Sequence, residues 1–558
     1  MGLFDGTRRF FSGIKPARAP EALARSFRDL WPGDAARGVA LLRGEFEVAG
    51  TTLALEPAPE HITGPAGWDA PSGPITWRAA AHGFAWLRDL RALGNDATRL
   101  RARDLTEDWL LRGCLEELAM APQVAAARIS AWLGHWDFLA ATAEDGFRKR
   151  LLVRLAQDAR GVVLSLPTEA AHRGALVTLK GALAGAIALE EEGWLTRVTR
   201  CLPDELTRQF NADGGHVERS PQQQLLACQD LIEIRNLLHG AGISVPNQLG
   251  AALDRAGLAL SMFRHGDGAL ALFNGSQEET AALVDLVLTQ GQSRGRAPTF
   301  LTETGFQRMQ AHKSVVLVDC GPPPAGRGSD IANNLPLGAD RFAHAGTLSF
   351  EMSVGRERLI VNCGAAPAGE GEWRDALRST AAHSTLVLAD TNSSELKDEG
   401  LGRRPDRVVA DRVEHNGQLW LDMTHDGWKK PFAATHRRRL YLSDTGDRLI
   451  GEDLLELPED AEVPPFTVRF HLHPDVTASL QQDESGVLLR LRSGQGWRLR
   501  AQNCQVELEE SIYLGAAPCN TSQIALHAGA GATALQWALT KIGAPEDEVP
   551  EAEAPPEE

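Results

Sequence analysis

The chain has 558 residues, of which 43% are hydrophobic and 23% charged, a composition typical of a soluble globular protein with several domains. Its 57 basic and 74 acidic residues give a net charge of -17, which disfavours a general nucleic-acid or anionic-membrane binder. The seven cysteines are widely spaced, without a CxxC pair. We therefore expect buried, reduced thiols and no disulfide framework.

The N-terminus carries basic residues but no apolar run of signal-peptide length, and no stretch approaches the length of a membrane-spanning helix. These features predict no transmembrane segment and favour a cytoplasmic protein. Residues 1–75 are mixed in character and form an N-terminal extension. A short β-like piece stands over 44–55, followed by a stretch rich in proline and glycine.

Residues 76–300 show a helical pattern. Apolar residues recur at i, i+3, i+4 and i+7 in successive segments of about 20 to 25 residues, separated by short polar loops. Two such helices make one repeating unit. The pattern predicts stacked helical hairpins, arranged either as a solenoid or as a closed α/α ring.

Near residue 300 the pattern changes to short segments that alternate or are β-branched, divided by Gly, Asp and Asn turns. Residues 301–544 therefore predict an antiparallel β-sandwich as a separate domain. Residues 545–558 are acidic and rich in proline, which predicts a disordered tail.

Polar residues of catalytic types gather in the loop over 210–221. They are Asn211, Asp213, His216, Glu218 and Arg219. A Gly-Gly pair permits unusual backbone angles there, and Ser-Pro begins the next helix in the favoured order. The residues alone allow two interpretations: a capped inter-helix loop with a hydrogen-bonded histidine, or a cleft loop that presents His216 and Arg219 to a substrate.

A second group of polar residues stands at strand boundaries in the β-rich half, flanked by arginines. It comprises His344, Asn362 and His383 with Arg341, Arg374 and Arg378. Weaker signals come from other positions. They are the strand-face pair His471 and His473, the polar residues His265, Asp267 and Asn274 at the end of the helical half, and Tyr441, which is expected to be a sheet residue.

Taken together, the motifs DGGHxxRSP, AHAGxxSFE, VNCG and RSTAAHSTL resemble bacterial heparinase II/III-type polysaccharide lyases over roughly residues 75–540. The resemblance implies an incomplete α/α toroid followed by an antiparallel β-sandwich, with a cleft between them. It also implies cleavage of an acidic, uronate-containing polysaccharide by β-elimination. That reaction needs the uronate carboxylate to be neutralised before the C5 proton is removed.

The resemblance also implies roles for single residues. His216 takes the position of a toroid Asn or His, and we expect it to be the catalytic residue, facing the cleft. The substrate-binding residues expected near it are Asn211, Arg219, Arg341 and Arg374. His344, Asn362 and His383 match the positions that can hold zinc, so we expect a divalent metal at their point of convergence.

The chain departs from the family pattern at several of these positions. Asn362 stands where the family has Asp, Phe342 replaces an assisting His, and residues 1–440 contain no tyrosine. Two alternatives to a lyase therefore stay open. One is a catalytically degenerate carbohydrate-binding relative; the other is a glycoside hydrolase that uses Glu218 and Asp213. Family resemblance also favours the periplasm or cell envelope over the cytoplasm, and the oligomeric state is left open.

Overall fold

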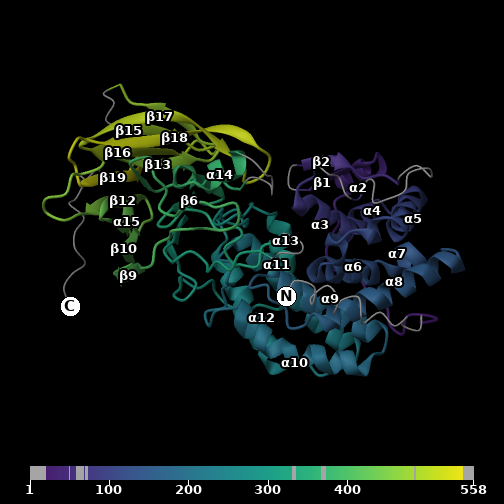
Figure 1. Cartoon of the computed structure of the whole chain (residues 1–558). Coiled ribbons are helices and arrows are strands. Elements are labelled where there is room, and N and C mark those ends of the chain that lie inside the picture. The colour runs from purple at the N-terminus through teal and green to yellow at the C-terminus, as the bar shows by residue number, and fades with distance from the viewer. Residues whose placement is uncertain are drawn as a thin grey trace.

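The computed structural model describes residues 20–48, 51–57, 68, 73–329, 335–365, 372–482 and 486–544 (Figure 1). The predicted acidic tail and the first nineteen residues lie outside the described residues. Helices fill the first half of the chain and antiparallel sheets fill the second, and the two parts lie side by side. The predicted class, a helical toroid followed by a β-sandwich, is confirmed.

An extended segment opens the described chain and leads into a small α/β unit. This unit consists of α2 (Ala35–Leu42) and the antiparallel hairpin of β1 (Glu45–Val48) and β2 (Thr51–Ala54). Asp34 caps α2 by accepting hydrogen bonds from the backbone of its first turn. The hairpin contains the short β piece predicted from the sequence.

The helical domain follows the predicted repeat of helix and short loop. Its helices are α3 (Ile75–Gly83), α4 (Leu87–Leu93), α5 (Asp96–Leu111), α6 (Pro122–Gly134), α7 (Trp136–Ala140), α8 (Asp145–Leu164), α9 (Gly174–Ala188), α10 (Glu192–Gln209), α11 (Pro221–Gly240), α12 (Asn247–Met262) and α13 (Ala281–Gly291), with the 3-10 turns η1 (Gly113–Leu115) and η2 (Leu118–Met120). Asn95, Ser220 and Thr280 cap three of them through side-chain oxygens. Proline stands at the first position of α6 and α11, where no backbone donor is needed.

Helices α3, α6, α9 and α11 pack in sequence around the toroid. The approach of α9 to α6 is close, because a Cβ added at Gly181 would lie 2.5 Å from the backbone oxygen of Ala126. Residues of these four helices line the central cavity described below. Their N-terminal ends all lie beside residues 335–342 of the β-domain, as contacts of Leu335, Pro336 and Arg341 show.

The β-domain contains two antiparallel sheets. One has the order β17-β18-β13-β7-β6-β5-β4-β3 with β8 beside β13, and the other the order β14-β15-β16-β19-β12-β11-β10-β9. The strands of the first are β3 (Phe300–Leu301), β4 (Phe306–Ala311), β5 (Ser314–Asp319), β6 (Phe350–Val354), β7 (Glu357–Val361), β8 (Leu386–Leu388), β13 (Phe466–Leu472), β17 (Cys504–Tyr513) and β18 (Cys519–Ala528). Those of the second are β9 (Val408–His415), β10 (Gln418–Trp428), β11 (Ala434–Leu442), β12 (Arg448–Glu456), β14 (Thr477–Leu480), β15 (Gly486–Arg490), β16 (Gly496–Gln502) and β19 (Ala534–Lys541). The short helices α14 (Glu372–Arg378) and α15 (Lys429–Phe432) and the turn η3 (Thr380–Ala382) lie between strands.

Two large apolar cores hold the molecule together. The β-domain core lies between the facing sheets, and the other core fills the helical domain. The helical core also takes in Leu301, Phe306 and Leu317 from β3, β4 and β5. The first strands after residue 300 therefore pack against the helices as well as within their own sheet.

A buried hydrogen bond and two ion pairs join the two domains. His265 contacts Glu351 at 2.8 Å, and Arg358 contacts Asp267 at 2.8 Å. Arg219 also pairs with Asp319 on β5. Within the described ranges, no helix has both the length and the apolar character needed to cross a bilayer.

Candidate functional site

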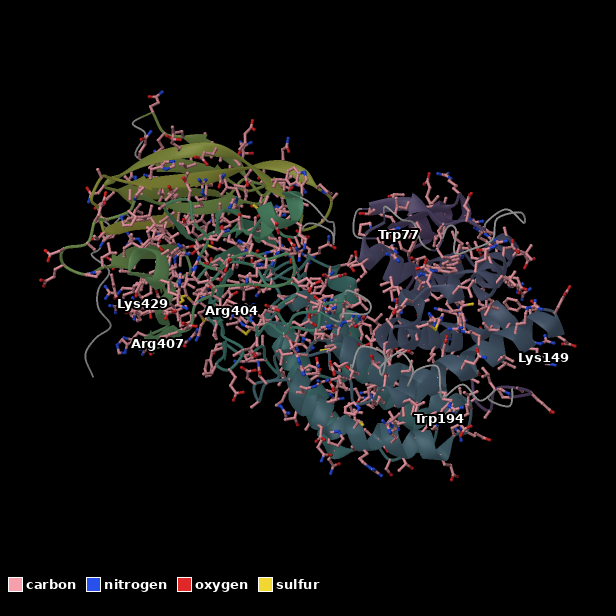
Figure 2. All side chains as sticks on the ribbon, in the orientation of Figure 1. Trp77, Lys149, Trp194, Arg404, Arg407 and Lys429 are labelled. Atoms are coloured by element: carbon pink, nitrogen blue, oxygen red, sulfur yellow. The ribbon has the colours of Figure 1, made fainter. Side chains whose placement is uncertain are left out.

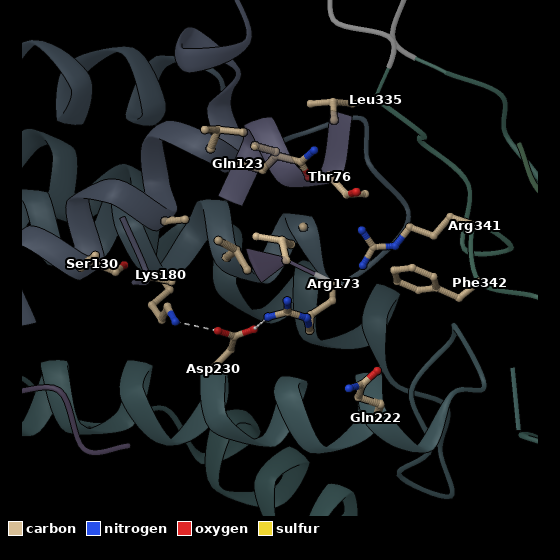
Figure 3. Close-up of a pocket in the computed structure, with 18 of the residues that line it drawn as sticks. Thr76, Gln123, Ser130, Arg173, Lys180, Gln222, Asp230, Leu335, Arg341 and Phe342 are labelled. Carbon is tan, nitrogen blue, oxygen red and sulfur yellow. Dashed lines mark hydrogen bonds and ion pairs between the residues drawn. The ribbon is translucent and has the colours of Figure 1, made fainter. Parts of the chain in front are cut away.

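A cavity of about 1370 Å³ lies between the helical domain and the β-domain (Figure 3). On the helical side its wall follows α6 from Gln123 to His135, a distance of about 18 Å at 1.5 Å per residue. On the other side it is bounded by Leu335, Arg341 and Phe342. Although the chain as a whole is acidic, eight cations line this cavity against six carboxylates among the described residues.

The helical wall carries a compact charge cluster. Lys180 on α9 contacts Asp230 at 2.7 Å, and Arg173 contacts Asp230 at 2.8 Å (Figure 3). Lys180 also contacts Glu233 at 2.8 Å. Burial raises the pKa of the Asp230 carboxyl, but Lys180 and Arg173 outweigh this effect and hold it below its usual range. These pairs fix two cations on the wall. Neither cation was predicted from the sequence, because a basic residue on a helix or just before one has the same pattern whether it faces solvent or a cavity.

The β-domain wall supplies three further cations, on Arg341, Arg374 and Arg378. The guanidinium of Arg341 lies 4.5 Å from the ring centre of Phe342, a cation–π contact. Arg378 donates to the carbonyl oxygens of Ala343 and Lys397 and is held in place by them. Arg374 lies 3.7 Å from the carboxylate of the neighbouring Asp375, and about a quarter of its side chain is exposed. Of the three, Arg374 is thus the least engaged by protein groups.

Glu218, from the loop over 210–221, supports this wall from behind. Its carboxylate is fully buried, accepts the backbone N–H of Arg173 at 2.8 Å and pairs with Arg341 at 2.8 Å. Burial raises its pKa, but Arg341 together with His216 and His172 outweighs this effect and lowers the pKa to about 2. Glu218 therefore aligns one arginine from each domain and does not itself lie on the cavity wall.

We expected His216 to face the cleft, and the structure places it elsewhere. The imidazole is 1% exposed and donates from Nε2 to the side-chain oxygen of Gln209 at 3.1 Å. Its ring packs edge-on against Phe210, and its backbone N–H donates to Gln224 at 2.6 Å. Burial lowers its pKa to about 4, so the ring is neutral at pH 7. Its contacts match the first interpretation, a hydrogen-bonded histidine inside a capped loop.

Arg219 and Asn211 also lie away from the cavity wall. Arg219 donates to the carbonyl oxygens of Thr304 and Gly305 and pairs with Asp319. Asn211 donates to the hydroxyl of Thr304 at 3.1 Å. Both side chains therefore fasten the 210–221 loop to the β-domain, whereas we had expected them to contact a substrate.

Asp213, the second carboxylate of the hydrolase alternative, has the same fastening role. It accepts hydrogen bonds from the backbone of Glu303 and Thr304. The backbone of Gly214 allows the tight turn here, because its φ is +88° and an added Cβ would lie 2.4 Å from the carbonyl oxygen of Arg255. Neither Asp213 nor Glu218 lies on the cavity wall.

His344 is the predicted residue that brings an imidazole to the wall beside the arginines. Its Nδ1 lies 3.1 Å from Nε2 of His383, and Nδ1 of His383 lies 2.7 Å from the carbonyl oxygen of Ser379. Because that carbonyl oxygen accepts a hydrogen bond from His383 Nδ1–H, the other nitrogen of His383, Nε2, accepts a hydrogen bond from His344 Nδ1–H. His344 is therefore left with Nε2 as its basic nitrogen. Burial and the nearby His383 hold its pKa well below the usual range.

The expected metal ligands are only partly brought together. His344 and His383 adjoin, but the side-chain oxygen of Asn362 accepts the backbone N–H of Ser384 at 2.9 Å. The amide nitrogen of Asn362 is buried without a hydrogen-bond partner and has no lone pair for a metal. If the Asn362 amide were rotated, its NH₂ group would face the backbone N–H of Ser384, and both groups are hydrogen-bond donors. The residues present thus do not fit the three protein ligands of a catalytic zinc site.

The remaining sequence candidates lie in buried contacts. Asn274 donates to the backbone oxygen of Arg219 and accepts from the backbone of His344, so it links the 210–221 loop to the cavity wall. His471 contacts Ser511 and the carbonyl oxygen of Ala381, whereas His473 packs on Tyr513. Their separate partners do not form the metal pair that a shared strand face suggested. The buried pairs of His265 and Asp267 are described above.

Neither tyrosine of the chain lies on the cavity wall. Tyr441 pairs with the ring of Trp420 on the neighbouring strand β10, as expected for a sheet residue. The Tyr513 hydroxyl donates to Glu278, and burial raises its pKa.

Comparison with known proteins shows which family this chain resembles. Residues 293–538 match the family model described as heparinase II/III-like, C-terminal. The FtsZ-localized protein C of Caulobacter vibrioides is 31% identical over 548 residues, which cover 94% of this chain and 91% of that protein. The chain belongs to the heparinase II/III-like family.

Solved structures share the fold of this heparinase II/III-like protein. A crystal structure of heparinase III aligns with a TM-score of 0.71 at 14% identity, over 96% of this chain and 88% of that one. The heparan sulfate lyase HepC from Pedobacter heparinus aligns with a TM-score of 0.57 at 15% identity, over 92% and 84%. At these identities the likeness concerns the fold, so the chemistry of this family member has to be argued from its own cavity.

Proposed function

We propose that this chain is a non-catalytic binding member of its family, which holds an acidic saccharide in the inter-domain cavity and associates with FtsZ. The observation that carries the first part is the composition of the cavity wall. It offers a cluster of arginines, whereas His216 and both tyrosines lie off the wall. A lyase needs a proton-transferring group beside the neutralised carboxylate. The cavity wall thus provides groups that can bind an anion, but the expected proton-transferring residues are not on it.

The cations are placed where an anion would enter. Arg173, Arg341 and Arg374 lie at the end of the cavity where α6, α9 and α11 begin. The N-terminal ends of helices carry partial positive charge, which adds to that of the arginines. Because Arg341 and Arg173 are partly neutralised by Glu218 and Asp230 at 2.8 Å, Arg374, whose contact with Asp375 is 3.7 Å long, is the most available of the three for a carboxylate or sulfate.

The association with FtsZ is supported by the similarity to the FtsZ-localized protein C, which extends over nearly the whole of both chains. It favours the compartment that holds FtsZ, in agreement with the cytoplasmic expectation from the N-terminal sequence. Co-sedimentation with FtsZ polymers tests it: the chain should enter the pellet only when FtsZ is present. A pellet fraction that is the same with and without FtsZ would refute the association.

The saccharide part is tested with a panel of heparan sulfate, chondroitin sulfate and alginate. Calorimetry should show binding to at least one polymer, weakened by salt and by Arg374→Ala. The matched control is Arg99→Ala, which removes an exposed cation from the helical domain, away from the cavity. If no polymer binds, or if the two variants behave alike, the cavity is not a saccharide site.

A lyase reaction is the second candidate, and the geometry of His344 favours it. This imidazole is neutral at pH 7, presents Nε2 as a base and stands near Arg374 and Arg378. It could remove the proton next to a carboxylate that those arginines neutralise. The same polymer panel, followed by the ultraviolet absorbance of unsaturated uronates, decides between the candidates. Absorbance that grows with the wild-type chain and is lost in His344→Gln would establish the lyase.

A further inference from the structure

The N-terminal segment crosses the end of the cavity that lies opposite the β-domain. We define residues 20–34 as the strap. The strap contacts the C-terminal ends of three cavity-lining helices in turn: Ala24 N–H donates to Ala188 at the end of α9, the Arg25 side chain donates to Gly240 at the end of α11, and Asp29 N–H donates to Gly134 at the end of α6. These bonds satisfy helix carbonyl groups that lack partners within their own helices.

Side-chain contacts hold the strap against the helical domain. The Asp29 carboxylate pairs with Arg88 on α4 at 2.6 Å and lies 3.1 Å from Nε2 of His135. The indole N–H of Trp31 donates to Glu233 at 2.5 Å, which connects the strap to the charge cluster on the helical wall. At Gly33 an added Cβ would lie 2.1 Å from the backbone oxygen of Arg88. The strap is therefore anchored along its length.

The strap also forms part of the cavity wall, through the four consecutive residues Phe27, Arg28, Asp29 and Leu30. They lie at the level of Gly134 and His135, about 18 Å along α6 from Gln123, which adjoins Gly174 next to Arg173. The cavity thus has arginines at both ends, with Arg173 and Arg341 beside the β-domain and Arg28 and Arg88 beside the strap. A linear chain that enters beside the β-domain would meet the strap at the other end.

We propose that the cavity takes the end of an acidic saccharide chain, or a short acidic oligosaccharide, and excludes the interior of a long polymer. This inference rests on the proposed saccharide function and adds the part of the ligand that is recognised. The strap is the element that sets this preference, because it lines the end of the cavity that lies away from the β-domain.

The experiment counts how many protein molecules one saccharide chain carries. Size-fractionated alginate and heparan sulfate, from tetrasaccharides to long polymers, are titrated with the full-length protein and examined by sedimentation velocity. We expect the same number of proteins per chain at every length, because each chain has the same number of ends. A number that rises in proportion to chain length would overturn the proposal.

Two variants connect the result to the strap. Asp29→Ala removes the carboxylate that joins the strap to Arg88 and His135, and Asp96→Ala removes a carboxylate from an exposed pair as the matched control. Only Asp29→Ala should let several proteins load on one long polymer. If Asp29→Ala fails to fold, Trp31→Phe takes its place. This variant keeps an aromatic side chain but loses the hydrogen bond to Glu233, and it should also let several proteins bind one long polymer. Folded strap variants that still show one protein per chain end would overturn the role of the strap.

Hydrogen exchange separates this inference from the function on which it rests. In the unliganded full-length protein, the amides of Ala24 and Asp29 should exchange slowly, since both are hydrogen-bonded to helix ends. Fast exchange across the strap would overturn the inference even if polymers bind. A protected strap in a protein that binds no saccharide would instead refute the saccharide function, and the inference would fall with it.

Discussion

Among single residues, Glu218 supports the cavity wall although it does not line the cavity. Its fully buried carboxylate holds Arg341 and the backbone of Arg173 in place. A carboxylate in that position is tolerated only while its partners remain.

Truncating Arg341 should therefore have a different effect from truncating Arg374. Arg341→Ala leaves Glu218 buried without its ion pair, so we expect the free energy of unfolding to fall by about 3 kcal/mol. Arg374 is partly exposed and weakly paired, so Arg374→Ala should change that free energy by less than about 0.5 kcal/mol while it weakens saccharide binding. Urea unfolding of the two variants checks this, and equal losses of stability would contradict it.

His216 should reveal itself through pH. Because burial lowers its pKa from 6.5 to about 4, the unfolded chain binds a proton in that interval that the native chain does not. Stability therefore falls as the pH drops from 6.5 towards 4, and His216→Gln should make that fall shallower by about 1.4 kcal/mol per pH unit. Urea unfolding at several pH values measures the slope, with His239→Gln, an exposed histidine, as the control. An unchanged slope would show that the native protein binds this proton too.

The pair formed by His344 and His383 should remain a hydrogen bond when zinc is offered. Asn362 uses its oxygen at Ser384, so the third ligand expected from the sequence is missing. We expect dialysis against micromolar zinc to leave less than one equivalent bound and the melting temperature unchanged. Stoichiometric zinc that is lost in His383→Ala would contradict this and restore the metal site.

At the scale of elements, the close contact of α9 with α6 fixes the width of the cavity. Gly181→Ala favours the helix itself, yet its Cβ would press on the backbone of Ala126. We expect the variant to lose about 1 to 3 kcal/mol of stability through overpacking. Gly250 on α12 has open space around it, so Gly250→Ala should gain up to about 1 kcal/mol. Thermal unfolding of both variants compares them, and a stabilised Gly181→Ala would show that the helices part easily.

The same elements show what a sequence can and cannot predict. The change from helical to strand periodicity near residue 300 was enough to predict both architectures, because burial on one face leaves a regular pattern. Arg341, Arg374 and His344 were selected from motifs, and all three lie on the cavity wall. Arg173, Lys180 and the strap were missed, because a helical basic residue or a polar N-terminal segment has the same pattern whether it faces solvent or a cavity.

The loop over 210–221 shows a second limit. Its residue types fitted a catalytic loop and a structural loop equally well, and the direction of each side chain depends on backbone angles such as the positive φ of Gly214. The partners of Arg219 lie on the β-domain, about 85 to 100 residues further along the chain. Partners at such distances in sequence leave no local signal.

For the molecule as a whole, the junction near residue 300 gives a test of the predicted domains. Arg294 and Arg296 are exposed between α13 and β3, so trypsin should cut there before it cuts within either domain. The fragments should nevertheless elute together in size exclusion, because Leu301, Phe306 and Leu317 are buried in the helical core. Separate elution after cleavage would show that the shared core is weak, and early cuts within 100–250 would contradict a closed helical domain.

The shared core also limits how this protein family can evolve by recombination. A crossover placed at residue 300, where the pattern changes, would separate strands β3, β4 and β5 from the helices whose core they complete. It would also leave Asp319, Glu351 and Arg358 without the partners that they have on the helical side. A functional chimera with another family member would therefore have to inherit these strands from the same parent as the helices, so the unit of inheritance extends well past the point where the helices end.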